Sequence, residues 1–399
     1  MSGWNKPLPS VGDNLERFAA SFDESRDFTV GVEEEFQLLD PETLELTHRF
    51  EDLKAALEPR MGAFARGELI ASEIEVCTGQ CNDMREAESD LLDKRIGLFE
   101  GAADLGITIG ASGTHPFADW KDQRILDTPH YRKVEEQLRY CAWRNTTFGT
   151  HTHIGVRGHE RVIAVYNTMR CYLPVLLALS ANSPFAEGRY TYLHSTRTQL
   201  FTKFFPRCNI PGPFEGWDEY ADYVETLFAC GSIDDVTQIW WSIRPHPLFG
   251  TLEIRVCDCQ GDIRDTLAIS ALIMALVAKT AADYDQGKAM CVLNSNQVEE
   301  NFWRAIRYGL DGNLIDFEAC REVPTRQVIE SLLSATEPFH GHLGLDAHLD
   351  RIADTLSGGN GAQRQIRLYE SSGDIHAVHR EVVEWAQPRN WLPAGGDRE

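Results

Sequence analysis

The sequence is poor in positive charge. It contains 38 Lys and Arg residues against 61 Asp and Glu in 399 residues, so the formal net charge is −23. Proteins that bind nucleic acid normally present a basic surface to the phosphate backbone. The composition therefore argues against a nucleic-acid partner, and an anionic substrate must be met by local arginines, lysines or metal ions.

Two phosphate-binding patterns are also missing. The chain has no G-x-x-x-x-G-K-[ST] loop and no G-x-G-x-x-G after a strand-like run. These absences argue against a Walker-type kinase and a dinucleotide-dependent enzyme. The glycine-rich residues 357–364 have two interpretations, a linker or a loop near phosphate, and we favour the linker.

Export and membrane signals are not apparent either. The N-terminus lacks the charged-then-apolar pattern of a signal peptide. The longest apolar stretch, Leu267 to Ala282, is interrupted by Ser270 and Lys279, and we find no uninterrupted apolar run long enough to span a bilayer. We therefore expect a cytoplasmic protein without a membrane partner.

The ten cysteines form no C-x-x-C pair. Cys77 and Cys81 are four residues apart, and Cys257 and Cys259 flank a single residue. These spacings suit a tetrahedral zinc site poorly. We interpret most of the cysteines as reduced, buried, small apolar residues.

Acidic residues stand inside two apolar, strand-like runs. In residues 28–39 the alternation of strand side chains puts Glu33 and Glu35 on one face and Glu34 on the other. In residues 67–76 the same rule puts Glu73 and Glu75 on one face. Carboxylates gathered in this way need cations, and hard oxygen ligands suit Mg²⁺ or Mn²⁺. A solvated edge strand is the alternative for the first run taken alone.

Two histidines share a face of a further strand-like run. Residues 150–156 read Thr-His-Thr-His-Ile-Gly-Val, which places His151 and His153 on the same side. A single histidine on a strand is more often an ordinary polar residue than a ligand. Two of them, in a chain with acidic strands, are candidate metal ligands.

Arginines occur in two later segments. Residues 240–258 read as two strands joined by a Pro/Gly turn, with Glu253 and Arg255 on one face, either as an ion pair or as a metal ligand beside a phosphate-binding cation. Residues 190–213 read as a loop in which Arg197 and Arg207 could meet an anionic substrate, although a solvated loop explains them as well.

Helical apolar spacing alternates with the strand-like runs. We expect helices over residues 83–105, 129–144 and 163–180, the last kinked at Pro174, and further helices after about residue 262 packed against the sheet. Residues 44–50 are expected to form the second strand of a hairpin, and residues 107–116 a buried strand and turn.

Four motifs together resemble the glutamate-cysteine ligase type 2 family, the YbdK-like carboxylate-amine ligases. They are Gly-Val-Glu-Glu-Glu-Phe, Glu-x-x-x-x-Glu-x-Glu, Thr-His-Thr-His-Ile-Gly and Gly-Thr-Leu-Glu-Ile-Arg, in the family's order. The resemblance implies an α+β fold like that of glutamine synthetase, in which a curved antiparallel sheet carries helices on its outer face. It implies one catalytic domain over residues 28–385, after a lead-in of residues 1–27 and before a tail of residues 386–399.

The resemblance also implies roles for individual residues. By motif position, one metal ion would use Glu33, His151 and Glu253, and another would use Glu35, Glu68 and Glu75. Glu73 is a possible substitute within the second acidic motif, and His153 is the close second to His151. Arg255 would face the transferred phosphoryl group and Arg244 a phosphate or substrate group. Apart from the resemblance, the loop residues Arg197 and Arg207 are our candidates for binding the nucleotide.

The implied reaction is an ATP-dependent ligation with Mg²⁺ or Mn²⁺. ATP would phosphorylate the γ-carboxylate of glutamate, and cysteine or another amine would displace phosphate, as in glutathione biosynthesis. Two alternatives stay open: a ligase with a different amine or carboxylate, and a metal-dependent hydrolase or metal-binding protein that does not use ATP. The family resemblance allows either a homo-oligomer or a monomer.

Overall fold

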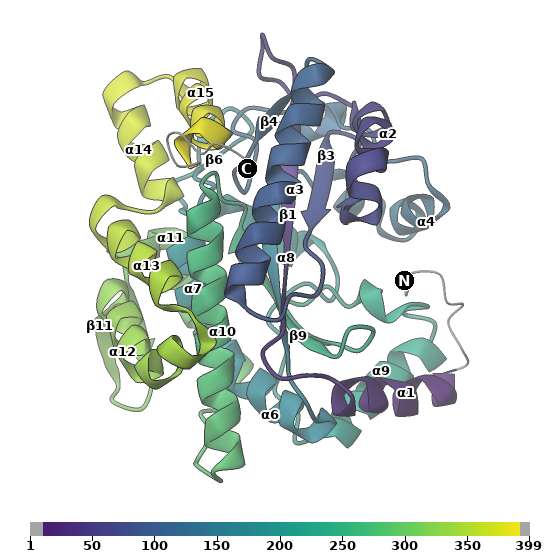
Figure 1. The fold of residues 1–399 in the computed structure, drawn as a ribbon, viewed down its shortest axis with the longest axis vertical. Helices are drawn as coiled ribbons and strands as arrows, with labels where there is room; N and C mark the ends of the chain where they lie inside the picture. The colour runs from purple at the N-terminus through teal and green to yellow at the C-terminus, as the bar shows by residue number, and fades with distance from the viewer. Residues whose placement is uncertain (1–10, 392–399) are drawn as a thin grey trace.

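The acidic strand β1 (Val30–Leu39) lies inside an open antiparallel sheet (Figure 1). A computed structural model describes residues 11–391. Strands of the main sheet follow the order β2-β3-β1-β5-β9-β8, and β4 pairs with the end of β1. The other six are β2 (Ala65–Arg66), β3 (Glu73–Cys77), β4 (Thr108–Gly110), β5 (Gly149–Gly155), β8 (Ile243–His246) and β9 (Thr251–Asp258). Two small hairpins are β6 (Phe185–Ala186) with β7 (Arg189–Tyr190), and β10 (Asn313–Asp316) with β11 (Arg321–Pro324).

The strand register brings the acidic and basic residues together. Glu35 lies opposite Glu75 of β3, and Glu33 lies opposite His151 of β5. Further along the sheet, His153 lies opposite Glu253. Because strand side chains alternate, these residues occupy one face of the sheet, as the sequence predicts.

Several helices pack against the sheet. Among them are α3 (Met84–Asp104), α6 (His159–Met169), α7 (Leu173–Ser180) and α10 (Ile263–Asp285). The remaining helices are α1 (Val11–Asp23), α2 (Phe50–Met61), α4 (Pro129–Leu138), α5 (Tyr140–Trp143), α8 (Thr196–Phe204), α9 (Trp217–Ala229), α11 (Ser295–Tyr308), α12 (Thr325–Leu343), α13 (Asp346–Gly358), α14 (Gly361–Ser372) and α15 (Ile375–Trp385). Of these, α2, α8 and α15 contact the strands β2, β9 and β4. In Figure 1 the later helices α12 and α13 lie beside α10, on the side away from α1 and α2.

Two of the core stretches are apolar and long enough to cross a membrane by length and composition alone, although the sequence interpretation found none. These are His159–Ser180 and Ile263–Asp285, and 83% and 89% of their most apolar windows are buried inside the protein. Packing in the core therefore accounts for their composition.

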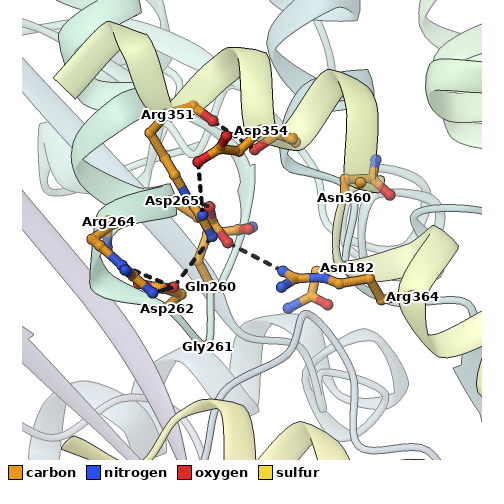
Figure 2. A network of polar contacts seen from close by, with 12 residues as sticks. Asn182, Gln260, Gly261, Asp262, Arg264, Asp265, Arg351, Asp354, Asn360 and Arg364 are labelled. Atoms are coloured by element: carbon orange, nitrogen blue, oxygen red, sulfur yellow. Dashed lines mark hydrogen bonds and ion pairs between the residues drawn. The ribbon is translucent and has the colours of Figure 1, made fainter. Parts of the chain in front are cut away.

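The Asp262–Asp265 network, shown in Figure 2, fastens the C-terminal helices to the start of α10. Asp262 caps α10 and accepts hydrogen bonds from Arg264 at 2.6 Å and Arg351 at 3.2 Å. Asp265 accepts from Arg351 of α13 at 2.8 Å and from Arg364 of α14 at 3.1 Å. Asp262 and Asp265 thus each meet two arginines.

Three predicted elements are corrected by the structure. Residues 44–50 form no strand, because Asp40 accepts backbone hydrogen bonds from the following turn and Leu44 takes a positive φ of 58°. The expected helix over residues 129–144 breaks at Arg139, whose φ is 47°. The expected loop over residues 190–213 contains α8, which Ser195 caps by accepting from the Thr198 amide.

Two other expectations are partly right. The helix over residues 163–180 is interrupted by a turn at Arg170–Tyr172, and Pro174 lies in the first turn of α7. The glycine-rich residues 357–364 connect α13 to α14, and Asn360 begins α14 with a capping box. They include the start of a helix that the sequence interpretation missed.

Candidate active site

The acidic face of the sheet is the floor of a cavity of about 310 Å³. Strands β1, β3, β5, β8 and β9 supply the floor, and α4, α8 and residues 66–69 contribute to the walls. The cavity is lined by every predicted site residue except one: Glu33, Glu35, Glu68, Glu73, Glu75, His151, His153, Glu253, Arg244, Arg255 and Arg197. The exception is Arg207, which donates to the Gln238 carbonyl oxygen and stacks near Trp240.

His151 stands at the centre of two groups that could hold a metal ion. One group is Glu33, His151 and Glu253, and the other is Glu35, Glu75 and His151, with ligand atoms within 4.8 Å of one another in each. His151 Nδ1 lies 3.3 Å from Glu33 Oε2, and its Nε2 lies 3.6 Å from Glu35 Oε1. The first group is the predicted one. The second contains His151 where the prediction had Glu68, which lies in the loop before β3.

The carboxylates of this face repel one another. Burial, and then the charge of Glu33, raises the pKa of Glu75 to about 8. Burial and neighbouring carboxylates also raise the pKa values of Glu68 and Glu73 well above their usual range. These raised pKa values mean that ionising the carboxylates costs free energy unless a cation binds beside them.

The pKa values of the two histidines shift in opposite directions. Burial and the adjacent Arg255 lower the pKa of His151, which favours the neutral imidazole that binds metals. Burial also lowers the pKa of His153, but Glu253 and Glu33 outweigh it and raise the pKa above its usual value. The Nε2 atoms of both rings are buried and lack a hydrogen-bond partner among residues 11–391.

This donor set fits a divalent cation. It consists mostly of carboxylate oxygens, the hard ligands typical of Mg²⁺ or Mn²⁺ sites, together with one imidazole nitrogen, which is a borderline ligand. The unpartnered Nε2 atom of His151 and the mutual repulsion of the carboxylates are the observations that support the fit.

Glu253 is the acid with the closest arginines. Arg244 Nε donates to it at 2.5 Å, and Arg255 forms an ion pair with its other oxygen. Burial raises the pKa of Glu253, but Arg244 and Arg255 hold it well below its usual value. Arg255 Nη1 also lies 3.4 Å from His151 Nδ1, so this guanidinium borders the candidate metal group.

Several residues around the site escaped the sequence analysis. Arg66 of β2 forms ion pairs with Glu33 at 3.5 Å and Glu75 at 3.4 Å. The Tyr131 hydroxyl of α4 donates to the Gly67 carbonyl oxygen at 2.7 Å, beside Glu68. No periodic pattern marks these residues, since β2 has only two residues and Tyr131 comes from a distant helix.

Behind the sheet, Glu34 faces away from the cavity as predicted. Arg95 of α3 donates to its two oxygens at 2.5 and 2.6 Å, and Thr266 of α10 donates at 2.6 Å. Glu34 and Arg95 are both fully buried. This ion pair ties β1, which carries Glu33 and Glu35, to two helices of the core.

Comparison with known proteins identifies relatives along most of the chain. The model of glutamate-cysteine ligase family 2 matches residues 29–384. A relative from Solibacter usitatus is 39% identical over 367 residues, covering 92% of this chain and 95% of the relative. A relative from Sorangium cellulosum is 41% identical over 362 residues, covering 90% and 96%. Both are provisionally named glutamate-cysteine ligase 2.

Two solved structures share the fold at 13% sequence identity. The glutamate-cysteine ligase of Francisella tularensis, in complex with AMP, has a TM-score of 0.67 over 94% of this chain and 91% of that one. A bifunctional glutathione synthetase from Pasteurella multocida has a TM-score of 0.64 over 95% of this chain and 54% of that one. These likenesses confirm the predicted α+β fold class.

Proposed function

The chain belongs to glutamate-cysteine ligase family 2, an ATP-dependent family of carbon-nitrogen ligases, and from this premise we propose that it joins the γ-carboxylate of L-glutamate to the amine of L-cysteine. The products would be γ-glutamylcysteine, which is a precursor of glutathione, together with ADP and phosphate. The AMP bound to the Francisella tularensis relative supports an adenine nucleotide as co-substrate.

One observation carries the proposal. The cavity places a group of carboxylates, centred on Glu35 and Glu75 and only partly balanced by Arg66, beside Arg244 and Arg255. Joining a carboxylate to an amine at neutral pH requires activation of the carboxylate, and transfer of a phosphoryl group between anions requires positive charge around it. The cavity offers both a place for cations and fixed cations of its own.

The acidic residues with His151 and the arginine have different roles in this proposal. Glu33, Glu35, Glu75 and His151 would hold Mg²⁺, which when bound neutralises phosphate oxygens and orients the nucleotide. Arg255 faces the cavity beside these residues and stabilises negative charge that develops on the transferred phosphoryl group.

Two more groups hold this arrangement in place. Glu253 fixes the guanidinium groups of Arg255 and Arg244 by direct ion pairs. Arg66 balances part of the negative charge between Glu33 and Glu75. The arginines and the acids are therefore held in position before a substrate binds.

We also place the reaction in the cytoplasm. All ten cysteines are free thiols, as a reducing compartment maintains them. Five are buried, namely Cys77, Cys81, Cys208, Cys257 and Cys259. The prediction that most cysteines are buried is therefore right for only half of them.

The choice between a monomer and a homo-oligomer stays a prediction.

Phosphate release from ATP tests the proposal. The protein is supplied with Mg²⁺, L-glutamate and a panel of amines that begins with L-cysteine, with metal-free, glutamate-free and amine-free controls. We expect release that requires the metal, glutamate and one amine, which names the acceptor. Release without any amine would indicate a hydrolase, and no release in any combination would contradict the ligase.

A further inference from the structure

Two cysteines from separate parts of the chain meet outside the cavity. Cys171 lies in the turn between α6 and α7, and Cys291 lies in the segment between α10 and α11. They are 120 residues apart in the sequence, yet Cys171 Sγ lies 3.7 Å from the Cys291 carbonyl oxygen. The two thiols are also within hydrogen-bond distance of each other. Neither residue lines the cavity.

The two thiols differ in exposure and in acidity. Cys291 is exposed, whereas Cys171 is half-buried. The hydrogen bond from Cys171 lowers the pKa of Cys291 to about 7, although burial opposes this shift. The same hydrogen bond, together with burial, raises the pKa of Cys171. Cys291 is therefore the thiol that ionises first and that solvent reaches.

A buried cation lies next to this pair. The Arg170 side chain is fully buried, and within residues 11–391 it forms no ion pair with a carboxylate. It donates instead to the carbonyl oxygens of Pro211 at 2.7 Å and Leu293 at 3.1 Å. A positive charge of this kind favours a thiolate over a thiol in its neighbourhood.

The segment that carries Cys291 has few other anchors. Residues 289–292 form no backbone-to-backbone hydrogen bond with any described residue. Arg170 holds the residues that follow, through the Leu293 carbonyl oxygen and the Ser295 hydroxyl at 3.4 Å. These contacts already bring the segment against the turn at Cys171, so a bond between the two sulfurs requires only a local adjustment.

We propose that Cys171 and Cys291 form a reversible disulfide by exchange with a low-molecular-weight disulfide, and that this bond fastens residues 286–294 to the turn before α7. An exposed cysteine that reacts, beside a more buried cysteine that resolves, is the arrangement of a redox-active pair. The groups of side chains that could hold a metal ion in the described part of the chain include neither cysteine. Because both lie outside the cavity, the bond acts on the stability of the fold and goes beyond the proposed ligation.

The exchange balances in two steps. The Cys291 thiolate attacks one sulfur of the small disulfide, which forms a mixed disulfide and releases one small thiolate that takes up a proton. Cys171 then loses its proton to solvent and attacks Cys291 Sγ, which releases the second small thiolate. Two protein thiols are oxidised to one disulfide, and the small disulfide is reduced to two thiols.

Oxidised glutathione is the probe for this exchange. The full chain is reduced, freed of reductant and incubated with an excess of the probe, and peptide mapping by mass spectrometry then locates every disulfide. We expect a bond between Cys171 and Cys291 that carries no glutathione and that a thiol reductant reverses. Because the bond joins residues 120 positions apart, the thermal midpoint of the oxidised protein should rise by roughly 3–10 °C.

Single variants separate the roles of the two thiols. Cys171→Ser removes the resolving thiol, so Cys291 should stop at a stable mixed disulfide with glutathione. Cys291→Ser removes the attacking thiol, so Cys171 should stay unmodified and the probe should no longer raise the thermal midpoint. Cys320→Ser removes another exposed cysteine, between β10 and β11, and should form the bond as the wild-type protein does.

Three results would overturn the inference. A lasting mixed disulfide on Cys291 of the wild-type protein would show that Cys171 does not resolve it. A bond between other cysteines, with Cys171 and Cys291 still free, would place the exchange elsewhere. A bond between Cys171 and Cys291 that leaves the thermal midpoint unchanged would remove its fastening role. All three results leave the proposed ligation intact.

Discussion

Two acid-rich clusters of this protein have opposite charge environments. In the Asp262–Asp265 network, burial raises the pKa of Asp262, but hydrogen bonds from Arg264 hold it below its usual value. In the cavity, burial and like charges raise the pKa of Glu75 to about 8. A cluster that supplies its own arginines is complete as part of the fold. A cluster whose arginines leave the pKa values of Glu68, Glu73 and Glu75 raised is arranged for a cation from outside.

The largest effect should come from removing a cavity carboxylate that contacts both histidines. Glu33 lies 3.3 Å from His151 and 3.6 Å from His153. Glu33→Gln is expected to lower the rate of phosphate release by at least about 100-fold, because a metal ligand is lost. The thermal midpoint should stay within a few degrees of wild type, and Glu51→Gln is the control. Full activity in Glu33→Gln would remove Glu33 from the metal site.

The second-largest effect is expected for Arg255, whose substitution should lower the catalytic rate more than it weakens the binding of ATP. Arg255→Ala is expected to lower kcat by roughly 100-fold, because a fixed cation beside the transferred phosphoryl group is lost. The KM for ATP should change much less, and Glu253 keeps Arg244 as its partner. A variant with normal kcat and a raised KM would show that Arg255 only binds the nucleotide.

A substitution in the Asp262–Asp265 network should change the stability of the protein and not its catalytic rate. Asp265→Asn removes the charge that faces Arg351 and Arg364, two arginines that are each about a quarter exposed. We expect a loss of about 1–3 kcal/mol in the free energy of unfolding, below the full cost for a completely buried pair. Denaturant unfolding measures it, with the exposed Asp354→Asn as control. A large fall in kcat with unchanged stability would contradict the structural role.

The smallest effect is a pH trend of the metal-free protein. Glu75 has a folded-state pKa of about 8 against a usual 4.5, so the folded protein keeps a proton that the unfolded chain has lost. Stability linked to this group is complete below pH 4.5 and is lost as the pH rises to about 8. Thermal midpoints in a chelator should therefore fall between pH 5.5 and 8, and saturating Mg²⁺ should reduce the fall. A rise in the chelator would contradict the shift.

The cavity floor could be predicted because strand alternation is a local property. The rule that places Glu33 and Glu35 on one face also places His151 and Glu75 on theirs, and the register then brings the strands together. Glu68 shows the limit of this rule, since it lies in a loop where alternation has no meaning.

Partners across the fold could not be predicted from the sequence. Arg66 is 33 residues from Glu33 in the sequence, and Arg95 is 61 residues from Glu34. No spacing rule links positions so far apart. Arg197 was placed in a loop because its segment is rich in polar residues, although Ser195 caps a helix there. Residues 44–50 alternate like a strand, but the turn at Asp40 prevents pairing over more than one bridge.

Binding of Mn²⁺ by wild type, Glu75→Gln and Asp265→Asn tests the contrast between the two clusters most directly. Calorimetry or electron paramagnetic resonance measures the Kd on the full chain at pH 7.5. The account predicts that Glu75→Gln weakens binding at least about 10-fold, because it removes an oxygen ligand from the cavity, whereas Asp265→Asn leaves the Kd unchanged. Equal Kd values for wild type and Glu75→Gln, or a comparable loss in Asp265→Asn, would contradict it.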